Sequence, residues 1–243
     1  YGYTVATEMY SAGIDRLTHQ PLSFSVSETT EGVHIHIIDA ELMGKGEKEK
    51  KDLYIEGVQN NGIINHYEYI INSEGTIEIR HVLKPEGKMP LWFPRIGLTL
   101  TVSDALDQVK WYGRGPQENY PDRKTGYPMG IYASTVQAMY EPYLMPQDYG
   151  LRTDVRWLQL TTDKGIGLQF KMNEWFNFNI YPYSTDNLTK AMYTYQLQKQ
   201  KGMTLNLDYA TTGVGCTARG VFGAYKAMPQ EYRRTISIRP MMK

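Results

Sequence analysis

Charged and amide side chains gather in one short stretch, WYGRGPQENYPDR, which runs from residue 111 to residue 123. Its guanidinium groups, carboxylates and amide belong to Arg114, Glu118, Asn119, Asp122 and Arg123. Ion pairs and hydrogen bonds to the backbone can hold such a loop in one shape without a ligand, as a structural clasp. The same groups beside Trp and Tyr rings also suit a sugar, because sugar hydroxyls both donate and accept while the C–H face stacks on an aromatic ring. Both interpretations stay open.

Two histidines, His34 and His36, are two residues apart in a stretch with strand-like alternation. This spacing can ligate zinc, but no third ligand is evident nearby in the sequence. We therefore expect an exposed polar face there and predict no metal site. His81 lies in phase with Ile77 and Ile79, so we expect a hydrogen-bonded histidine of the core or sheet edge.

Period-two alternation of apolar residues recurs along the chain and predicts strands with one buried face. It is found at residues 22–26, 33–37, 96–102, 166–170, 176–180, 203–207 and 236–238. Turn signals separate these runs at the spacing of hairpins, including Glu31-Gly32, Ser73-Glu74-Gly75 and Asp163-Lys164-Gly165. The pattern predicts an all-β, antiparallel fold.

Other segments add little to this architecture. Residues 184–191 predict a short helix that Ser184 or Thr185 can cap, and the pattern through Tyr10 is too weak to assign. The charged run from Gly44 to Lys51 has no apolar anchor, so we interpret it as a solvated hairpin tip. No linker divides the chain, and we predict one domain over residues 1–243.

The charge balance excludes several partners. The chain has 26 basic and 26 acidic side chains, so it has no net field to attract nucleic acid or an anionic membrane. No apolar run approaches the roughly 20 residues that cross a bilayer. The single cysteine, Cys216, excludes an intrachain disulfide.

Several pieces of the chain resemble one protein family. The longest is GPQENYPDR, and the pieces PY, MP, GLR and RWLQL follow it in order. Two more, PRIGLTLTV and FNIYPYS, fall in corresponding places, so the resemblance extends from about Met9 to Arg239. The family is the C-terminal domain, also called the small chain, of the large family 2 beta-galactosidases.

The resemblance implies a beta-supersandwich of the galactose mutarotase-like kind, appended to a catalytic barrel that is not in this sequence. The expected partners are that barrel, the other domains of the parent enzyme, and a beta-galactoside or galactose. No cofactor is expected. The chain opens at Tyr1 without an initiator Met or a signal pattern, so we expect a piece of a longer polypeptide. The missing signal does not locate the parent enzyme, for which the cytoplasm and the periplasm of a bacterium are both expected.

The resemblance also directs attention to the loop GVGCTARGVFG, residues 213–223. Well-known relatives present a tryptophan from this loop to the sugar, whereas this chain has Arg219 and its neighbours there. We expect Arg219 to replace the tryptophan by hydrogen-bonding sugar hydroxyls, with Phe222 or Tyr225 supplying an aromatic ring. The glycines of the loop predict a more open site.

The family's domain begins some tens of residues before the matched part, so we expect an unpaired sheet edge near Leu22 or Val33. Such an edge predicts either a homo-oligomer or a cover formed by residues 1–15.

No catalytic residue is predicted. Asn173-Glu174 resembles the pair that carries the acid/base carboxylate in family 2 barrels, but we expect it in a turn between two strands, without a second carboxylate about 5 Å away. The predicted function is a non-catalytic domain of a beta-galactosidase, which hydrolyses terminal beta-D-galactosides. The alternatives are a freestanding aldose epimerase and a carbohydrate-binding module.

Overall fold

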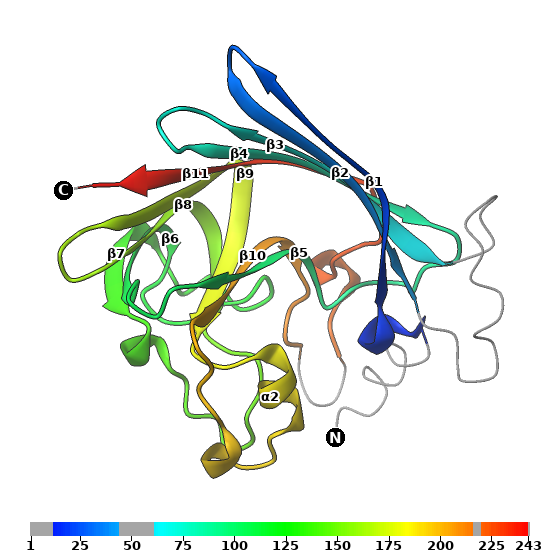
Figure 1. Ribbon diagram of the computed structural model, residues 1–243. Coiled ribbons are helices and arrows are strands. Elements are labelled where there is room, and N and C mark those ends of the chain that lie inside the picture. The colour runs from blue at the N-terminus through cyan, green and yellow to red at the C-terminus, as the bar shows by residue number, and fades with distance from the viewer. Residues whose placement is uncertain (1–11, 44–60, 216–219, 243) are drawn as a thin grey trace. The chain divides into compact units, whose positions relative to one another are not determined.

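The computed structural model describes residues 12–43, 61–215 and 220–242. Those within Tyr1–Pro94 and Val214–Ser237 form one compact unit, and those within Arg95–Gly213 and Ile238–Lys243 form a second. Figure 1 labels the strands and the α-helix of the described residues. No helix in these described ranges is long and apolar enough to span a membrane. The prediction of one domain over residues 1–243 stays a prediction.

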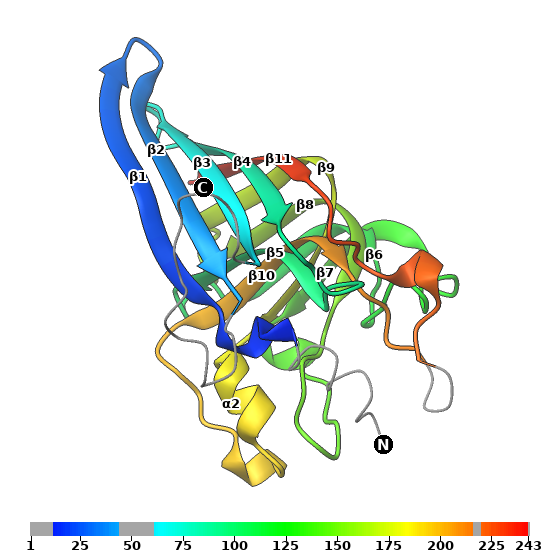
Figure 2. The ribbon, with the colours of Figure 1, turned by 90° about the vertical axis from the view of Figure 1, so that its right-hand side faces the viewer.

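The first unit is built on antiparallel hairpins. The short 3-10 helix η1 (Ile14–Arg16) precedes its strands. The strands are β1 (Thr18–Thr29), β2 (Gly32–Leu42), β3 (Gly62–Ile71), β4 (Ile77–Glu86) and the first part of β11 (Tyr232–Met241). They lie side by side in the order β1-β2-β3-β4-β11 (Figure 2). The predicted turn after β3 forms because Asn72 Oδ1 accepts from the backbone N–H groups of Glu74 and Thr76, both at 3.0 Å.

Six described strands lie entirely within the second unit, which also includes the last residues of β11. They are β5 (Arg95–Val102), β6 (Gln108–Arg114), β7 (Met129–Thr135), β8 (Arg152–Thr161), β9 (Gly167–Tyr181) and β10 (Met203–Thr211). They pair in the order β5-β10-β9-β8-β6-β7, and every recorded register between them is antiparallel. The core is filled by Trp111, Leu158, Phe170, Phe178 and Leu205, which are almost completely buried. The antiparallel all-β fold class is thus confirmed.

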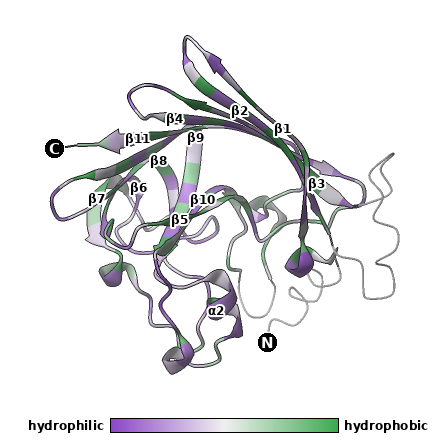
Figure 3. Ribbon diagram, viewed as in Figure 1, coloured by the Kyte–Doolittle hydropathy of each residue, from purple (hydrophilic) through white to green (hydrophobic). Residues whose placement is uncertain are grey.

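Hydrophobic and hydrophilic residues follow one another along the strands (Figure 3), as period-two alternation requires. One strand prediction is wrong. Residues 167–170 and 176–180 belong to a single strand, β9, and Glu174 lies inside it rather than in a turn. Both runs pair with β8 in the same direction, and the extra residues are absorbed by a register shift between Val155 and Trp157.

The predicted helix after Ser184 is confirmed as α2 (Thr185–Lys190), because the Ser184 hydroxyl accepts from the Asn187 backbone N–H at 3.1 Å. Short 3-10 helices are η3 (Gln137–Met139), η4 (Thr194–Gln196) and η5 (Gly223–Tyr225). The segments through Tyr10 and from Gly44 to Lys51 lie outside the described residues.

Candidate functional site

The loop after β6 is fixed where it begins. A Cβ atom at Gly113 would lie 2.8 Å from the Val155 side chain and 3.0 Å from its Cα, so the backbone approach of β6 to β8 requires glycine here. The indole N–H of Trp111 donates to the carbonyl of Arg114 at 3.0 Å. The chain therefore leaves β6 in one defined direction.

Arg114 is held by a carboxylate on β8. Its Nε donates to Asp154 Oδ2 at 2.6 Å, and Lys124 Nζ contacts Asp154 Oδ1 at 2.8 Å. Arg114 also donates to the carbonyls of Lys124 and Tyr127. Burial alone raises the pKa of Asp154, but the hydrogen bonds from Lys124 and Arg114 outweigh it and the pKa is lowered. The carboxylate therefore stays charged and joins both ends of the loop to β8.

Glu118 is a buried anchor with 6% exposure. Its carboxylate accepts from Arg123 at 2.8 Å, from the Gly150 backbone N–H at 2.9 Å and from the hydroxyls of Tyr120 and Tyr143. Four donors leave little acceptor capacity for a substrate proton. The residue joins the loop to the segment that precedes β8.

Asn119 is completely buried. Its side-chain oxygen accepts from the backbone N–H of Thr153 at 3.1 Å and from the Thr153 hydroxyl, while its amide donates to the carbonyl of Gln117. The Asn119 backbone N–H donates to Leu151 at 2.8 Å. Buried polar groups need such partners, so this residue holds the loop against β8.

Two predicted site residues of the loop are accessible at its surface: Asp122 is half-buried, and the side chain of Arg123 is 49% exposed. Gly213 lies directly against Asp122, since a Cβ atom there would be 2.3 Å from the carboxyl carbon. The loop that begins at Gly213 therefore starts beside Asp122. Arg219, the remaining predicted site residue, lies outside the described residues.

A buried polar network in the second unit was missed by the sequence analysis. Arg95 of β5 donates to both carboxylate oxygens of Asp208 on β10, at 2.6 and 3.1 Å, and to Asn179 on β9 at 3.1 Å. Asn206 extends it by donating to Asn179 at 2.8 Å, and Asp148 contacts Arg95 at 3.3 Å.

The ion pair sets the charges of this network. Burial lowers the pKa of Arg95, but the charge of Asp208 outweighs it and the pKa is raised. Burial raises the pKa of Asp208, and the contact with Arg95 opposes this. The sequence signal that could have indicated this network is the alternation of Thr204, Asn206 and Asp208 with leucines. Because β10 lies between β5 and β9, both of its faces are buried, and the polar face therefore needs buried partners.

The sequence matches the family described as Beta galactosidase small chain over residues 8–238. The chain belongs to this family. It is 38% identical over 147 residues to a beta-galactosidase of Priestia megaterium, a match that covers 60% of this chain and 14% of the relative. It is 31% identical over 207 residues to a beta-galactosidase of Vibrio cholerae, covering 85% of this chain and 18% of the relative. The chain thus spans less than a fifth of these relatives.

Among solved structures, the small-chain domain is similar to the GalM/aldose epimerase homologue from C. elegans. The TM-score is 0.43 at 12% sequence identity, and the match covers 90% of this chain and 69% of that one.

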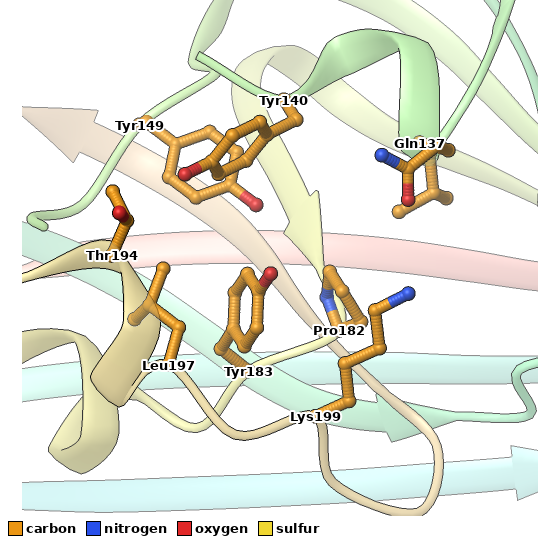
Figure 4. A pocket seen from close by; sticks show the side chains of 9 residues that line it. Gln137, Tyr140, Tyr149, Pro182, Tyr183, Thr194, Leu197 and Lys199 are labelled. Atoms are coloured by element: carbon orange, nitrogen blue, oxygen red, sulfur yellow. The ribbon is translucent and has the colours of Figure 1, made fainter. Parts of the chain in front are cut away.

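The small-chain domain has a tyrosine-lined pocket of about 210 Å³ in its second unit. In Figure 4, Tyr183 lies between Pro182 and Leu197, below Tyr140 and Tyr149. The rings of Tyr140 and Tyr149 are perpendicular, with centroids 5.3 Å apart. Gln137, Thr194 and Lys199 add polar groups to the lining. The carbonyl of Tyr149 accepts from Asn179 at 3.0 Å, which joins the pocket to the polar network.

All five histidines of the small-chain domain precede residue 82. His81 is buried, its Nε2–H donates to Asn65 Oδ1 at 3.0 Å, and its ring stacks on Tyr67 with ring centroids 4.2 Å apart. Burial lowers the pKa of His81 to about 4, so the ring is neutral at pH 7. A hydrogen-bonded core histidine was predicted and is confirmed. An epimerase needs a histidine acid beside a carboxylate base, and the polar network around Asp208 has carboxylates but no histidine in the described part of the second unit.

Proposed function

We propose that this chain is a non-catalytic domain of a beta-galactosidase, which supports the catalytic barrel of the parent enzyme and lines part of the sugar site. The relatives that carry the name beta-galactosidase support this assignment. The observation that carries it is the state of Glu118, whose carboxylate accepts from four donors inside the protein. A carboxylate engaged in this way stabilises a loop and is unsuited to proton transfer.

The proposed contribution to the sugar site comes from the exposed side of the same loop. Asp122 and Arg123 offer an acceptor and a fork of donors, and the internal contacts of Arg114, Glu118 and Asn119 hold them in one geometry. Such preorganisation limits the entropy lost when a sugar is bound. Arg123 also lies over the Tyr120 ring at 5.2 Å, which restricts its guanidinium group further.

The proposed contact with the rest of the parent enzyme involves β1. Phe24 and Val26 are 68% and 54% exposed, and they lie two residues apart in the regular part of β1, hence on the same side of the strand. Large exposed apolar groups in a row are typical of interaction surfaces. Because the relatives are more than five times longer than the matched segment, the proposed partner is the remaining chain of the parent enzyme.

Two measurements test the proposal. The isolated chain should not hydrolyse a chromogenic beta-galactoside, and turnover that disappears in a Glu118→Gln or Glu174→Gln variant would refute the non-catalytic role. In the parent enzyme, Arg123→Lys keeps a positive charge beside Glu118 but loses the guanidinium fork, and it should raise KM for the galactoside. An unchanged KM would remove this loop from the sugar site.

Whether the loop of residues 213–223 contributes to the sugar site is tested with a second variant. Gly220 has a φ of 64°, which a tryptophan side chain adopts poorly, so introducing an aromatic ring there would strain the backbone. Phe222 is exposed and has an ordinary backbone conformation. Phe222→Ala in the parent enzyme should alter the preference among aglycones, with the exposed Leu91→Ala as a control. The same aglycone preference in the wild type, Phe222→Ala and Leu91→Ala would contradict the proposal.

A further inference from the structure

We propose that the first unit binds a divalent transition metal such as Zn²⁺ through His34 and His36 of β2 and Glu68 of β3. The sequence analysis expected no third ligand near the two histidines, and this expectation is corrected by strand pairing. Glu68 lies directly opposite His36 in the antiparallel register of β2 and β3. Directly opposed side chains have Cβ atoms about 4.5–5.5 Å apart, close enough to share one ion.

The ligand atoms are near the separations that a metal requires. His34 Nδ1 lies 3.6 Å from Glu68 Oε1, and His36 Nε2 lies 4.0 Å from the same oxygen. One ligand atom from each residue lies within 4.8 Å of the other two. Tetrahedral ligands at Zn–N and Zn–O distances of about 2.0–2.1 Å are about 3.3 Å from one another. The distances to Glu68 must therefore shorten by less than about 1 Å, which side-chain rotation alone can supply.

The surroundings of His34 provide an acceptor for its second nitrogen. His34 Nε2 is buried with no hydrogen-bond partner, and Glu31 Oε2 lies 4.0 Å from it. When Nδ1 binds a metal, Nε2 carries the proton, and a carboxylate at that position is the usual partner of a metal-bound histidine. Glu31 completes such a pair with a small movement.

The carboxylate of Glu68 is oriented in the same way. Its Oε2 accepts from Arg80 at 3.1 Å, and this leaves Oε1 directed to the histidines. Arg80 also donates to Glu78 at 2.8 Å, so its charge is shared between two carboxylates. The site has three nearby carboxylates, those of Glu31, Glu68 and Glu78, and one guanidinium group, that of Arg80. The local charge is therefore negative, which favours the binding of a divalent cation.

The donor set and exposure indicate which metal binds. Two imidazoles and one carboxylate suit Zn²⁺, Co²⁺, Ni²⁺ or Cu²⁺, whereas Mg²⁺ and Ca²⁺ prefer oxygen ligands alone. The His36 side chain is 51% exposed, while that of His34 is 13% exposed. The ion can enter from the His36 side, and water can fill a fourth position.

A second group of the same unit serves as a control. His19, Asp39 and Glu41 also lie close together, but the His19 ring already bonds to Asp39 at 3.1 Å and the group has only one imidazole. Replacing His19 removes one histidine from the unit without touching the proposed ligands.

The test is titration of the 243-residue chain with Zn²⁺ by calorimetry, together with the visible absorption of the Co²⁺ form. We expect one ion per chain, a four-coordinate Co²⁺ spectrum, and affinity at least about tenfold lower in both His36→Ala and Glu68→Gln. His19→Ala should bind as the wild type does. His36 is half-exposed, so its variant should keep the wild-type circular dichroism spectrum, and Glu68→Gln gives a second, nearly isosteric variant. The proposal is overturned if the wild type shows no saturable binding, if both ligand variants bind normally, or if only His19→Ala loses binding.

Discussion

Arg114 and Asp154, forty residues apart in the chain, form an ion pair with Nε and Oδ2 2.6 Å apart, and Lys124 contacts the same carboxylate. Among the residues that the structure describes, Asp154 is the one non-glycine residue with a positive φ, which is 56°. This left-handed conformation is tolerated by Asp and Asn better than by most residues. The backbone conformation of Asp154 thus orients the carboxylate that binds Arg114 and Lys124 at the two ends of the loop.

Asp154→Asn should separate charge from backbone geometry. Asparagine also adopts the left-handed conformation, so the variant loses the charge-assisted bonds without added strain. We expect the free energy of unfolding to fall by about 1.5–3 kcal/mol, as for hydrogen bonds to charged groups. Urea denaturation measures the change, and Asp163→Asn in an exposed turn should shift it by less than about 0.5 kcal/mol. Equal effects of the two variants would mean that the ion pair does not stabilise the fold.

Gly113→Ala should destabilise the second unit. The added methyl group would lie 2.8 Å from Val155 Cγ2 and 3.0 Å from Val155 Cα, and a backbone atom cannot rotate away. Overpacking of this kind costs about 1–3 kcal/mol. Gly126→Ala is the matched control, because nothing lies within 4 Å of the added methyl group. Thermal melting of both variants checks the prediction, which fails if Gly113→Ala melts at the temperature of the control.

Acidification should weaken the first unit through His81. Its folded-state pKa of about 4 lies below the ordinary value of 6.5, so the unfolded chain binds the proton more readily between these values. The contribution of His81 to the free energy of unfolding is therefore fully present above about pH 6.5 and is lost as the pH falls toward 4. This contribution is on the order of 3 kcal/mol. Urea denaturation at pH 7 and pH 4.5 measures the loss.

His81→Gln is the control for this pH dependence. Glutamine keeps a hydrogen-bonding group toward Asn65 but does not titrate, so the variant should lose less stability on acidification than the wild type. His19 shifts in the opposite direction, because its hydrogen bond to Asp39 raises its pKa, and its contribution is present at low pH and lost as pH rises. Identical pH profiles of wild type and His81→Gln would exclude His81 as the source.

Self-association of the isolated chain should depend on β1. This strand ends the order β1-β2-β3-β4-β11, and no strand among the described residues pairs with its other side. Unpaired edges and exposed apolar side chains both favour association. We expect a concentration-dependent dimer in analytical ultracentrifugation, weakened at least tenfold in Phe24→Lys. The predicted oligomer is ruled out if the wild type is monomeric at high concentration, in which case the cover by residues 1–15 remains to be tested by removing them.

The sequence alone was enough for the local parts of this protein. Alternation in residues 33–37 and 203–207 predicts β2 and β10, because side chains on a strand point to opposite faces in turn. Ser184 predicts the start of α2, because its hydroxyl satisfies a backbone donor three residues on. The cluster of charges in residues 114–123 also marked a loop that side-chain hydrogen bonds fix against the segment around β8.

Only the tertiary structure decided what those charges contact. Glu118 and Asn119 are separated by about 30 residues from their partners Gly150 and Thr153, and Glu68 meets His36 through the register of two strands. The sequence predicts two separate strands for the two runs of β9, because a bulge interrupts alternation just as a turn does. Burial of both faces of β10 likewise depends on neighbours from β5 and β9. Spacing along the chain specifies which way a side chain points, whereas pairing between distant segments determines which partner it meets and whether water can reach it.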